Sequence, residues 1–466
     1  MKKSIYPAVT ISRMPAIATL LLLSIYGCTT PQLDPPSSIT SDIASRIGAK
    51  PNWSDQVVDG AALHAAASLP VPNPLDEATA VAITINTSPD IARMIAETEA
   101  MRYEALDVSA PMNPMLNFAT GIPLDSMGVV PIFAMLMVQI DELWKQPIRS
   151  ASARDLYEAA LLSLGAKAVT MASEVRSLWH EVGLRDEEYS WAMHDLELTD
   201  QLLAIARERF AVGESDGNAV AKAQAERVDA HQRSEVAQEM RATARLALMA
   251  LMGRPMDTVE WTTGAPDATA NHAIHGTLSS ETAMIASLAL SRLDVRAANA
   301  RAKAAASKLQ LAQRSRINQM QLGGGYDRAM QGDEGVGFAL NVEIPIFNTG
   351  SWRIAKAQAE YRVAEIMAEK TRQTAIIELR SAWVKARAAE NRHAALESDV
   401  LTPSIDIARR AKEAFEAGEG AERESIDAEH ALNHVHLALT DLERERRTSR
   451  LGLSKAAGFL PAEEMP

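Results

Sequence analysis

Residues 335–347 read GVGFALNVEIPIF, and this stretch decides the fold. Apolar side chains alternate in it with small or polar ones, at Val336, Phe338, Leu340, Val342, Ile344 and Ile346. Alternation with a period of two residues is the pattern of a β-strand that has one apolar face. Asn341 and Glu343 fall on the opposite face. The stretch therefore predicts a strand whose two faces meet different surroundings, one of them lipid and the other a wet lumen.

Three further stretches have extended character. Residues 132–140 place five apolar side chains on one face, namely Ile132, Ala134, Leu136, Val138 and Ile140. Weaker extended segments lie at 112–120 and 317–326, and the glycines 323–325 would allow a sharp bend in the latter. Four strands cannot close a barrel, and open strand edges cannot face lipid, but three copies of the chain supply twelve strands. A soluble sandwich hairpin is the alternative on pattern alone.

The sequence around these strands is duplicated within the chain. Four short sequences recur in the same order with offsets of 204 or 205 residues: 89–91 at 293–295, 175–179 at 379–383, 210–213 at 415–418, and 245–248 at 450–453. A period this long excludes a solenoid and predicts a duplicated half-molecule. Each half contains a helix that opens near Pro89 or Leu293, then two strands, then a long helical region.

The helical regions carry a coiled-coil pattern. Val175, Val182, Tyr189, Leu196, Leu203 and Phe210 recur every seven residues. Residues 150–210 contain no proline, and as one helix they would reach about 90 Å, several times the roughly 30 Å of a bilayer's hydrocarbon core. The helix must therefore project out of the membrane. It turns at 213–218 and returns to about Met252, and the second half repeats this with its turn at 418–420.

The N-terminus is typical of a secreted lipoprotein. Lys2, Lys3 and Arg13 precede an apolar run at 16–26 that is too short to span a bilayer and fits a secretory signal. The sequence Ile25-Tyr26-Gly27-Cys28 resembles the bacterial lipobox, which implies that Cys28 is lipidated; the alternative is an ordinary signal peptide with an incidental cysteine. We expect a signal peptide at 1–27, a proline-rich tether at 28–74, a first repeat at 75–277 and a second at 278–466.

Composition excludes several classes of protein. The 466 residues include 47 Lys and Arg against 60 Asp and Glu, a net charge of −13, which disfavours a nucleic-acid partner. The single cysteine excludes a disulfide framework. The sequence lacks GxxxxGK[ST] and HExxH motifs, and its GxSxG match at 213–217 falls in the turn between two predicted helices and not in a strand-to-helix elbow, so we expect no enzyme activity and no cofactor.

The ordered set of lipobox, tether and duplicated helix, strand pair and coiled-coil hairpin resembles the TolC-type outer-membrane efflux family, in particular its lipoprotein members. Local signatures are the run 292–298, the Phe-x-x-Gly turns at Phe210 and Phe415, and the strand exit 344–350. The resemblance implies a mainly α fold with a β-barrel portion: a homotrimer with a twelve-stranded transmembrane barrel in the outer membrane and a helical tunnel in the periplasm of a Gram-negative bacterium.

The same resemblance implies function. A periplasmic adaptor and an inner-membrane pump would be the partners, and the chain would be the passive exit duct for drugs, organic solutes or metal ions. The alternative is a non-conducting coiled-coil lipoprotein that braces the envelope. The strand at Phe338 separates the two hypotheses, since a brace needs no row of lipid-facing side chains.

The resemblance also implies two functional regions. Acidic residues after the second hairpin turn, Glu424 and Asp427, would form rings of three carboxylates at the narrow periplasmic end; a solvated coiled-coil tip explains them equally. Val212 and Gly213 in the first turn, with Ala417 and Gly418 in the second, would contact the adaptor. Simple helix-reversal chemistry is the alternative for both turns.

Histidine and methionine raise the question of a metal site. His430 and His434 lie four residues apart, with His436 nearby, and five methionines gather around the first strand pair at Met112, Met115, Met127, Met135 and Met137. Thioethers suit Cu(I), and imidazole suits copper or zinc. Solvated histidines and gap-filling methionines are the ordinary explanation, so the sequence predicts no metal.

Overall fold

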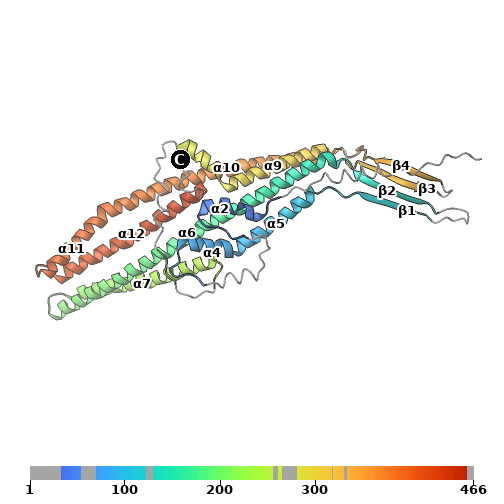
Figure 1. The fold of residues 1–466 in the computed structure, drawn as a ribbon. Helices are drawn as coiled ribbons and strands as arrows, with labels where there is room; N and C mark the ends of the chain where they lie inside the picture. The colour runs from blue at the N-terminus through green and yellow to red at the C-terminus, as the bar shows by residue number, and fades with distance from the viewer. Residues whose placement is uncertain are drawn as a thin grey trace, which may run out of the picture. The chain divides into compact units, whose positions relative to one another are not determined.

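The computed structural model describes residues 33–53, 70–121, 130–255, 261–264, 281–316, 318–329 and 333–458. The predicted signal peptide at 1–27, Cys28, part of the tether and Met127 lie outside the described residues. Figure 1 shows long helices and one sheet.

The elements follow the same order twice. A short 3-10 turn (Pro36–Ile39) and α2 (Thr40–Ile47) come first. The first repeat then contains α4 (Glu77–Thr87), α5 (Pro89–Ser109), β1 (Met115–Thr120), β2 (Ile132–Gln139), α6 (Glu142–Ala211) and α7 (Gly217–Leu251). The second contains α8 (Glu281–Ser291), α9 (Leu293–Arg314), β3 (Gln321–Arg328), β4 (Glu334–Asn341), α10 (Ser351–Leu396), α11 (Thr402–Glu416) and α12 (Glu422–Ala457). The internal duplication is confirmed, and the domain boundaries stay predictions.

Two compact units divide the chain, and each takes segments from both repeats. Of the described residues, the first unit takes those within 33–34, 100–158 and 300–366, and it contains the sheet. The second comprises the remainder and contains both hairpin turns. A repeat is therefore not a spatial unit, because its strands pair with the strands of the other repeat.

In the described residues, four strands form one antiparallel sheet in the order β1-β2-β3-β4. The repeats meet at β2 and β3, which pair along their whole length from Ile132 opposite Arg328 to Gln139 opposite Gln321. Residues directly opposite one another share a face. The register therefore brings the even-numbered side chains of all four strands to one face and the odd-numbered ones to the other.

The glycine triplet lies inside β3, and the bend that it would allow is not formed. The ladder continues through all three glycines to β2 and β4. A side chain at Gly323 would come within 2.9 Å of Met137 Cγ, and one at Gly325 within 2.3 Å of the Ala134 carbonyl oxygen. Glycine is used here for a close approach of strands and of buried methionine side chains, and the backbone stays extended.

The strand predicted over 335–347 is shorter than expected. β4 ends at Asn341, which pairs with Gln321, the first residue of β3, so the ladder offers no further partner. Pro345 also lacks the N–H that a continuing strand would donate. Three of the predicted strand residues, Val342, Ile344 and Ile346, consequently lie beyond β4, where they are exposed.

The first hairpin agrees with the prediction and extends it. α6 is 70 residues long, about 105 Å at 1.5 Å per residue. It begins before the predicted residue 150 and runs through Pro147. α7 returns to Leu251, and the Asp216 side chain caps its start by accepting from the Ala219 N–H at 3.0 Å. Within the described residues, none of the helices combines the length and the apolar run that crossing a bilayer requires.

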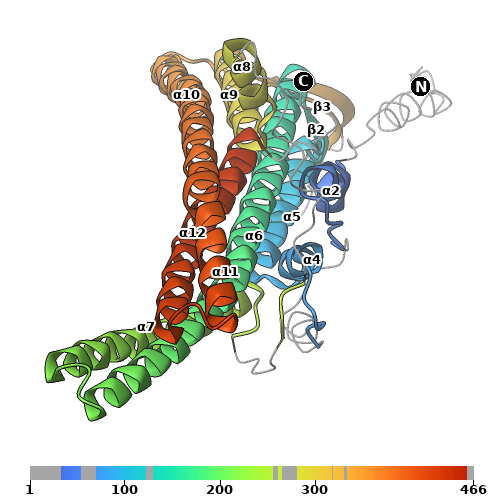
Figure 2. The same ribbon diagram turned by 90° about the vertical axis from the view of Figure 1, so that its left-hand side faces the viewer.

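The second hairpin differs from the first by a break. A π-helical turn at Glu397–Leu401 separates α10 from α11, and Pro403 lies in the first turn of α11. Proline cannot donate to the preceding turn, which is why the helix widens there. Figures 1 and 2 show α6 alongside α7, and α11 alongside α12.

The core of the second unit is built around Trp179 on α6. Its indole Nε1 donates to the Leu75 carbonyl at 2.9 Å, and the ring is fully buried. Gly165, further along the same helix, packs against Leu293 and Ile39, whose methyl groups would lie within 2.9 and 3.0 Å of an added Cβ. This packing fixes α6 against the 3-10 turn at Pro36–Ile39 and against the start of α9.

Candidate functional site

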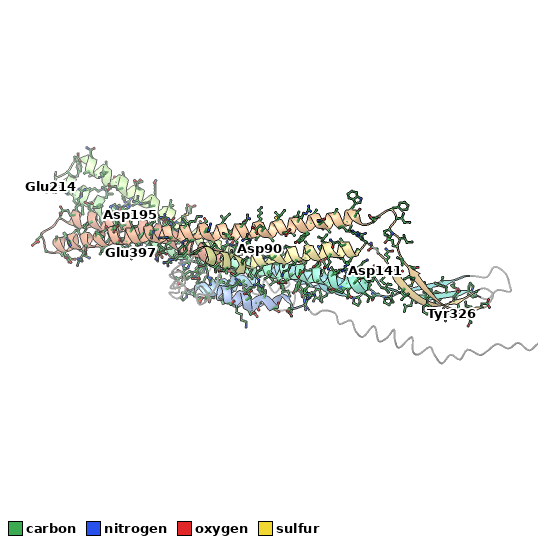
Figure 3. The ribbon with its side chains drawn as sticks, turned by 90° about the horizontal axis from the view of Figure 1, so that it is seen from above. Asp90, Asp141, Asp195, Glu214, Tyr326 and Glu397 are labelled. Carbon is green, nitrogen blue, oxygen red and sulfur yellow. The ribbon has the colours of Figure 1, made fainter. Side chains whose placement is uncertain are left out.

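One face of the sheet is apolar and exposed. It carries Leu116, Phe118, Leu136, Val138, Leu322, Tyr326, Val336, Phe338 and Leu340. Phe338 is 80% exposed and Val336 is 74% exposed; Figure 3 labels Tyr326 on the same sheet. A contiguous apolar surface of this kind is unfavourable in water. The face therefore needs apolar surroundings that a single chain does not supply.

The opposite face is mostly small and polar. It carries Asn117, Gln139, Gln321, Gly323, Gly325, Asp327, Gly335, Gly337, Ala339 and Asn341. Met115 and Phe133 are exposed apolar side chains on the same face. Met135 and Met137 are the buried apolar side chains on this face. Two faces of opposite polarity are what a wall between lipid and water requires.

Both edges of the sheet are open. β1 and β4 each have one neighbour among the described strands, so each presents a row of backbone N–H and C=O groups without a strand partner. Open edges are costly in lipid, because no water is present to satisfy these groups. The sheet is complete only when β1 and β4 pair with strands from other chains.

A buried polar junction lies where β2 passes into α6 (Figure 3). The Asp141 carboxylate accepts from Lys145 Nζ at 2.6 Å and from the Gln319 backbone N–H at 3.2 Å. Lys145 also donates to Asn318 Oδ1 at 2.9 Å. The junction joins the exit of β2 to the entry of β3. Sequence reasoning missed it, because its members lie about 180 residues apart.

Each hairpin turn uses a glycine in the left-handed region. Gly213 has φ +79° and Gly418 has φ +75°. The Gly213 N–H donates to Phe210 O at 3.1 Å, and the Gly418 N–H donates to Phe415 O at 2.9 Å, so the two Phe-x-x-Gly turns close alike. Val212, one of the predicted adaptor contacts, is 70% exposed at the end of its hairpin.

The two turns differ in their acidic residues. In the first, the Ala219 N–H bond lowers the pKa of the Asp216 carboxyl from its usual range. In the second, Glu424 and Asp427 lie exposed on α12, and Asp427 Oδ2 lies 3.4 Å from Arg423 Nε. Between them Ile426 is buried against α6. The two acids predicted for the constriction therefore face away from the helix that α12 packs on.

A cluster of ionisable side chains lies between the hairpins, on α6, α7 and α12; we name it the Asp195 cluster (Figure 3). The Asp195 side chain is fully buried. Its Oδ2 accepts from Arg233 Nη2 at 2.6 Å, and its Oδ1 lies 3.0 Å from His430 Nε2 and 3.6 Å from His434 Nε2. The two Nε2 atoms lie 3.1 Å apart.

The electrostatics of the Asp195 cluster favour an ionised Asp195 carboxylate and a neutral His434 imidazole. Burial raises the pKa of Asp195, but hydrogen bonds with His430 and Arg233 outweigh it and hold that pKa well below its usual range. Burial lowers the pKa of His434, and the charges of His430 and Arg233 lower it further, while Asp195 acts in the opposite sense. Sequence reasoning found the two histidines and missed Asp195.

Three of the predicted methionines lie together on one face of the sheet. Met115 and Met137 lie opposite each other across β1 and β2, with Met135 two residues along. Met137 Sδ accepts from Asn341 Nδ2 at 3.7 Å, and Met135 and Met137 pack over the glycines of β3. Met112 is exposed. These contacts give the described methionines a packing role in the sheet.

Comparison with known proteins agrees with this architecture. Residues 284–459 match the family model described as outer membrane efflux protein. The match covers the described second repeat from α8 to the end of α12. No curated protein matches the chain in sequence.

Solved structures share the fold over most of the chain. CusC, from a study of transmembrane channel formation, has a TM-score of 0.67 and 19% identity over 82% of this chain and 92% of its own. The outer membrane protein VceC of Vibrio cholerae has a TM-score of 0.64 and 18% identity, over 81% of this chain and 95% of its own. The open MtrE outer membrane channel of Neisseria gonorrhoeae has a TM-score of 0.62 and 18% identity, over 81% of this chain and 88% of its own. With the family match, these confirm the resemblance to the TolC-type family.

Proposed function

Since the chain carries an outer membrane efflux protein domain and the fold of outer-membrane channels, we propose that it is the outer-membrane duct of a tripartite efflux system. The observation that carries the proposal is the sheet, which is apolar on one face, polar on the other and open at both edges. Three copies that pair β4 with β1 of the next chain close a twelve-stranded wall. Solute then crosses the bilayer along the polar face.

The helices support the same assembly. Met367, Ile377 and Val384 lie on α10 at spacings of a heptad pattern, and each is more than half exposed. An exposed apolar seam with this period is what a neighbouring helix covers in a coiled coil. The homotrimer buries this seam along with the open strand edges.

The hairpin turns are the proposed contacts of the partners. Val212 and Gly213, with Ala417 and Gly418, are placed at the ends of the hairpins, where the helical tips of a periplasmic adaptor can dock. The adaptor joins the duct to an inner-membrane pump, which supplies the energy. This chain acts passively, because its sequence lacks a phosphate-binding GxxxxGK[ST] loop.

Glu424 and Asp427 are the proposed constriction. In a homotrimer each forms a ring of three carboxylates, and rings of one sign select cations. Both are exposed on α12, away from α6, as such a ring requires. Lipidation at Cys28 anchors the mature chain in the outer membrane, since acyl chains add about 0.8 kcal/mol per buried methylene. The helical hairpins extend into the periplasm.

The test is conductance across a planar lipid bilayer. The wild-type protein is expected to conduct ions with a preference for cations. Glu424→Gln/Asp427→Gln is expected to raise the conductance and to weaken that preference, because the negative rings are gone. Glu422→Gln removes another exposed first-turn acid of α12 and is the matched control.

The outcomes distinguish failure of the duct hypothesis from failure of the constriction hypothesis. A bilayer that stays silent with wild type and double variant alike contradicts the duct and supports the non-conducting brace. A double variant that conducts like Glu422→Gln contradicts the constriction and leaves the duct standing.

A further inference from the structure

We propose that Asp195, His430 and His434 bind a divalent transition-metal cation of the Zn²⁺ type. The three side chains come from different repeats, Asp195 from α6 and the histidines from α12, where a spacing of four residues puts both imidazoles on one side of the helix. Their ligand atoms are Asp195 Oδ1 and the two histidine Nε2 atoms.

The spacing of these atoms fits one small cation. Zinc binds nitrogen and oxygen ligands at about 2.0–2.2 Å in tetrahedral geometry, which separates the ligand atoms by roughly 3.3–3.5 Å. The three separations in the structure are 3.0, 3.1 and 3.6 Å. A point about 2 Å from all three atoms therefore exists without rearrangement of the helices.

Protons alone satisfy this arrangement poorly. If both Nε2 atoms carry hydrogen, two N–H groups face each other at 3.1 Å. If only His430 carries the proton and donates it to Asp195, the lone pair of His434 Nε2 still faces the same carboxylate oxygen at 3.6 Å. A cation at the centre pairs with three lone pairs at once and removes this conflict.

The surroundings support binding. Arg233 occupies the other oxygen of Asp195, which fixes the carboxylate and leaves Oδ1 turned to the histidines. Asn433 is 2% exposed, and its Nδ2 lies 3.4 Å from Asp195 Oδ1. Its buried Oδ1 has no hydrogen-bond partner among the described residues, so it offers an acceptor to a metal-bound water.

The ligand set selects the class of metal. Two imidazoles and one carboxylate suit Zn²⁺, Ni²⁺ and Cu²⁺, whereas Mg²⁺ and Ca²⁺ prefer oxygen ligands alone. Three protein ligands leave a fourth position for water. His434 is about half exposed, so a cation reaches the site from solvent.

The consequence is a link between the two hairpins. A bound cation joins α6 of the first repeat to α12 of the second, which already pack together through Leu198, Leu202 and Ile426. Metal binding here does not depend on the proposed duct, because all three ligands belong to one chain.

The experiment uses untagged, full-length protein in detergent and titrates Zn²⁺ by calorimetry. Wild type is expected to bind one Zn²⁺ per chain, and its thermal midpoint is expected to rise with Zn²⁺. His434→Gln removes a half-exposed ligand and should fold normally. It is expected to weaken binding at least about 100-fold, since loss of an outer-shell partner alone costs 10- to 100-fold. His231→Gln, an exposed histidine on α7, is the matched control.

Electron paramagnetic resonance of the Cu²⁺-loaded protein adds a second readout. Hyperfine coupling to two imidazole nitrogens is expected in wild type and to one in His430→Gln. The proposal is overturned if wild type binds no Zn²⁺, or if His434→Gln binds as tightly as His231→Gln. Conductance plays no part in either result, so failure of the duct and failure of the metal site are distinguishable.

Discussion

Phe338→Arg tests the assignment of the two faces of the sheet. Phe338 is 80% exposed on the apolar face of β4, whereas its neighbour Gly337 lies on the polar face, where an added Cβ meets no atom within 4 Å. Arginine on the lipid side of a membrane sheet costs about 2–4 kcal/mol at the bilayer midplane. Three copies of the chain multiply this to about 6–12 kcal/mol for the assembly. Gly337→Arg places the same charge in the lumen, where water solvates it.

The assay is refolding into lipid vesicles, followed by urea titration of the assembled protein. Phe338→Arg is expected to lose most of the assembled fraction, or to lower the urea midpoint strongly, while Gly337→Arg stays close to wild type. Equal losses in the two variants would refute the assignment of faces. A larger loss in Gly337→Arg would mean that the faces are reversed.

Three further predictions concern packing and charge. Gly325→Ala is expected to prevent pairing of β2 with β3, because its Cβ would lie 2.3 Å from the Ala134 carbonyl oxygen. Circular dichroism should show a loss of strand content in this variant. Gly335→Ala, which has open space around its Cβ, is the control and should keep its strand content. Trp179→Phe is expected to lower the free energy of unfolding by about 0.5–1.5 kcal/mol, since the indole hydrogen bond to the Leu75 carbonyl is lost while the Gly264 N–H still donates to that carbonyl; an unchanged thermal midpoint would contradict this. Burial raises the pKa of Glu443, but Arg446 and Arg447 outweigh it and lower that pKa, with His393 facing the same carboxylate. Its stabilisation is therefore present above the unfolded pKa of about 4.3 and lost as pH falls through the folded value; Glu443→Gln should be less stable at pH 7 and should show a smaller further loss on acidification than wild type.

The fold was predictable because its signals are local and repeated. The heptad positions from Val175 onward and the Phe-x-x-Gly turns mark the hairpins without knowledge of distant contacts. The errors came from pairing. The alternation past Asn341 looks like strand, but a strand ends where its partner ends, and β3 begins at Gln321. The break at Glu397–Leu401 was missed because Pro403 alone does not say whether a helix stops or widens.

The candidate sites were only partly predictable. The family resemblance implies Glu424 and Asp427 by their distance from the turn glycine Gly418, and their role, like that of the turn residues, stays a prediction. Asp195 was not predictable, because its partners Arg233 and His430 lie 38 and 235 residues away and one acid among many on α6 carries no signal. The junction of Asp141, Lys145 and Gln319 is hidden for the same reason. Only the fold brings these groups together.

The most direct test of the trimeric wall is a disulfide between the two open edges of the sheet. Asn117→Cys on β1 and Gly337→Cys on β4 place one thiol on each edge and on the same face. Since Cys28 is the only native cysteine, the two single variants are the controls. After oxidation in membranes, the double variant is expected to give covalent species of two and three chains and none larger. Cross-linked species of more than three chains would contradict a closed wall of three chains. So would a failure to cross-link, with only monomer seen for this pair and for neighbouring cysteine pairs on the same two strands.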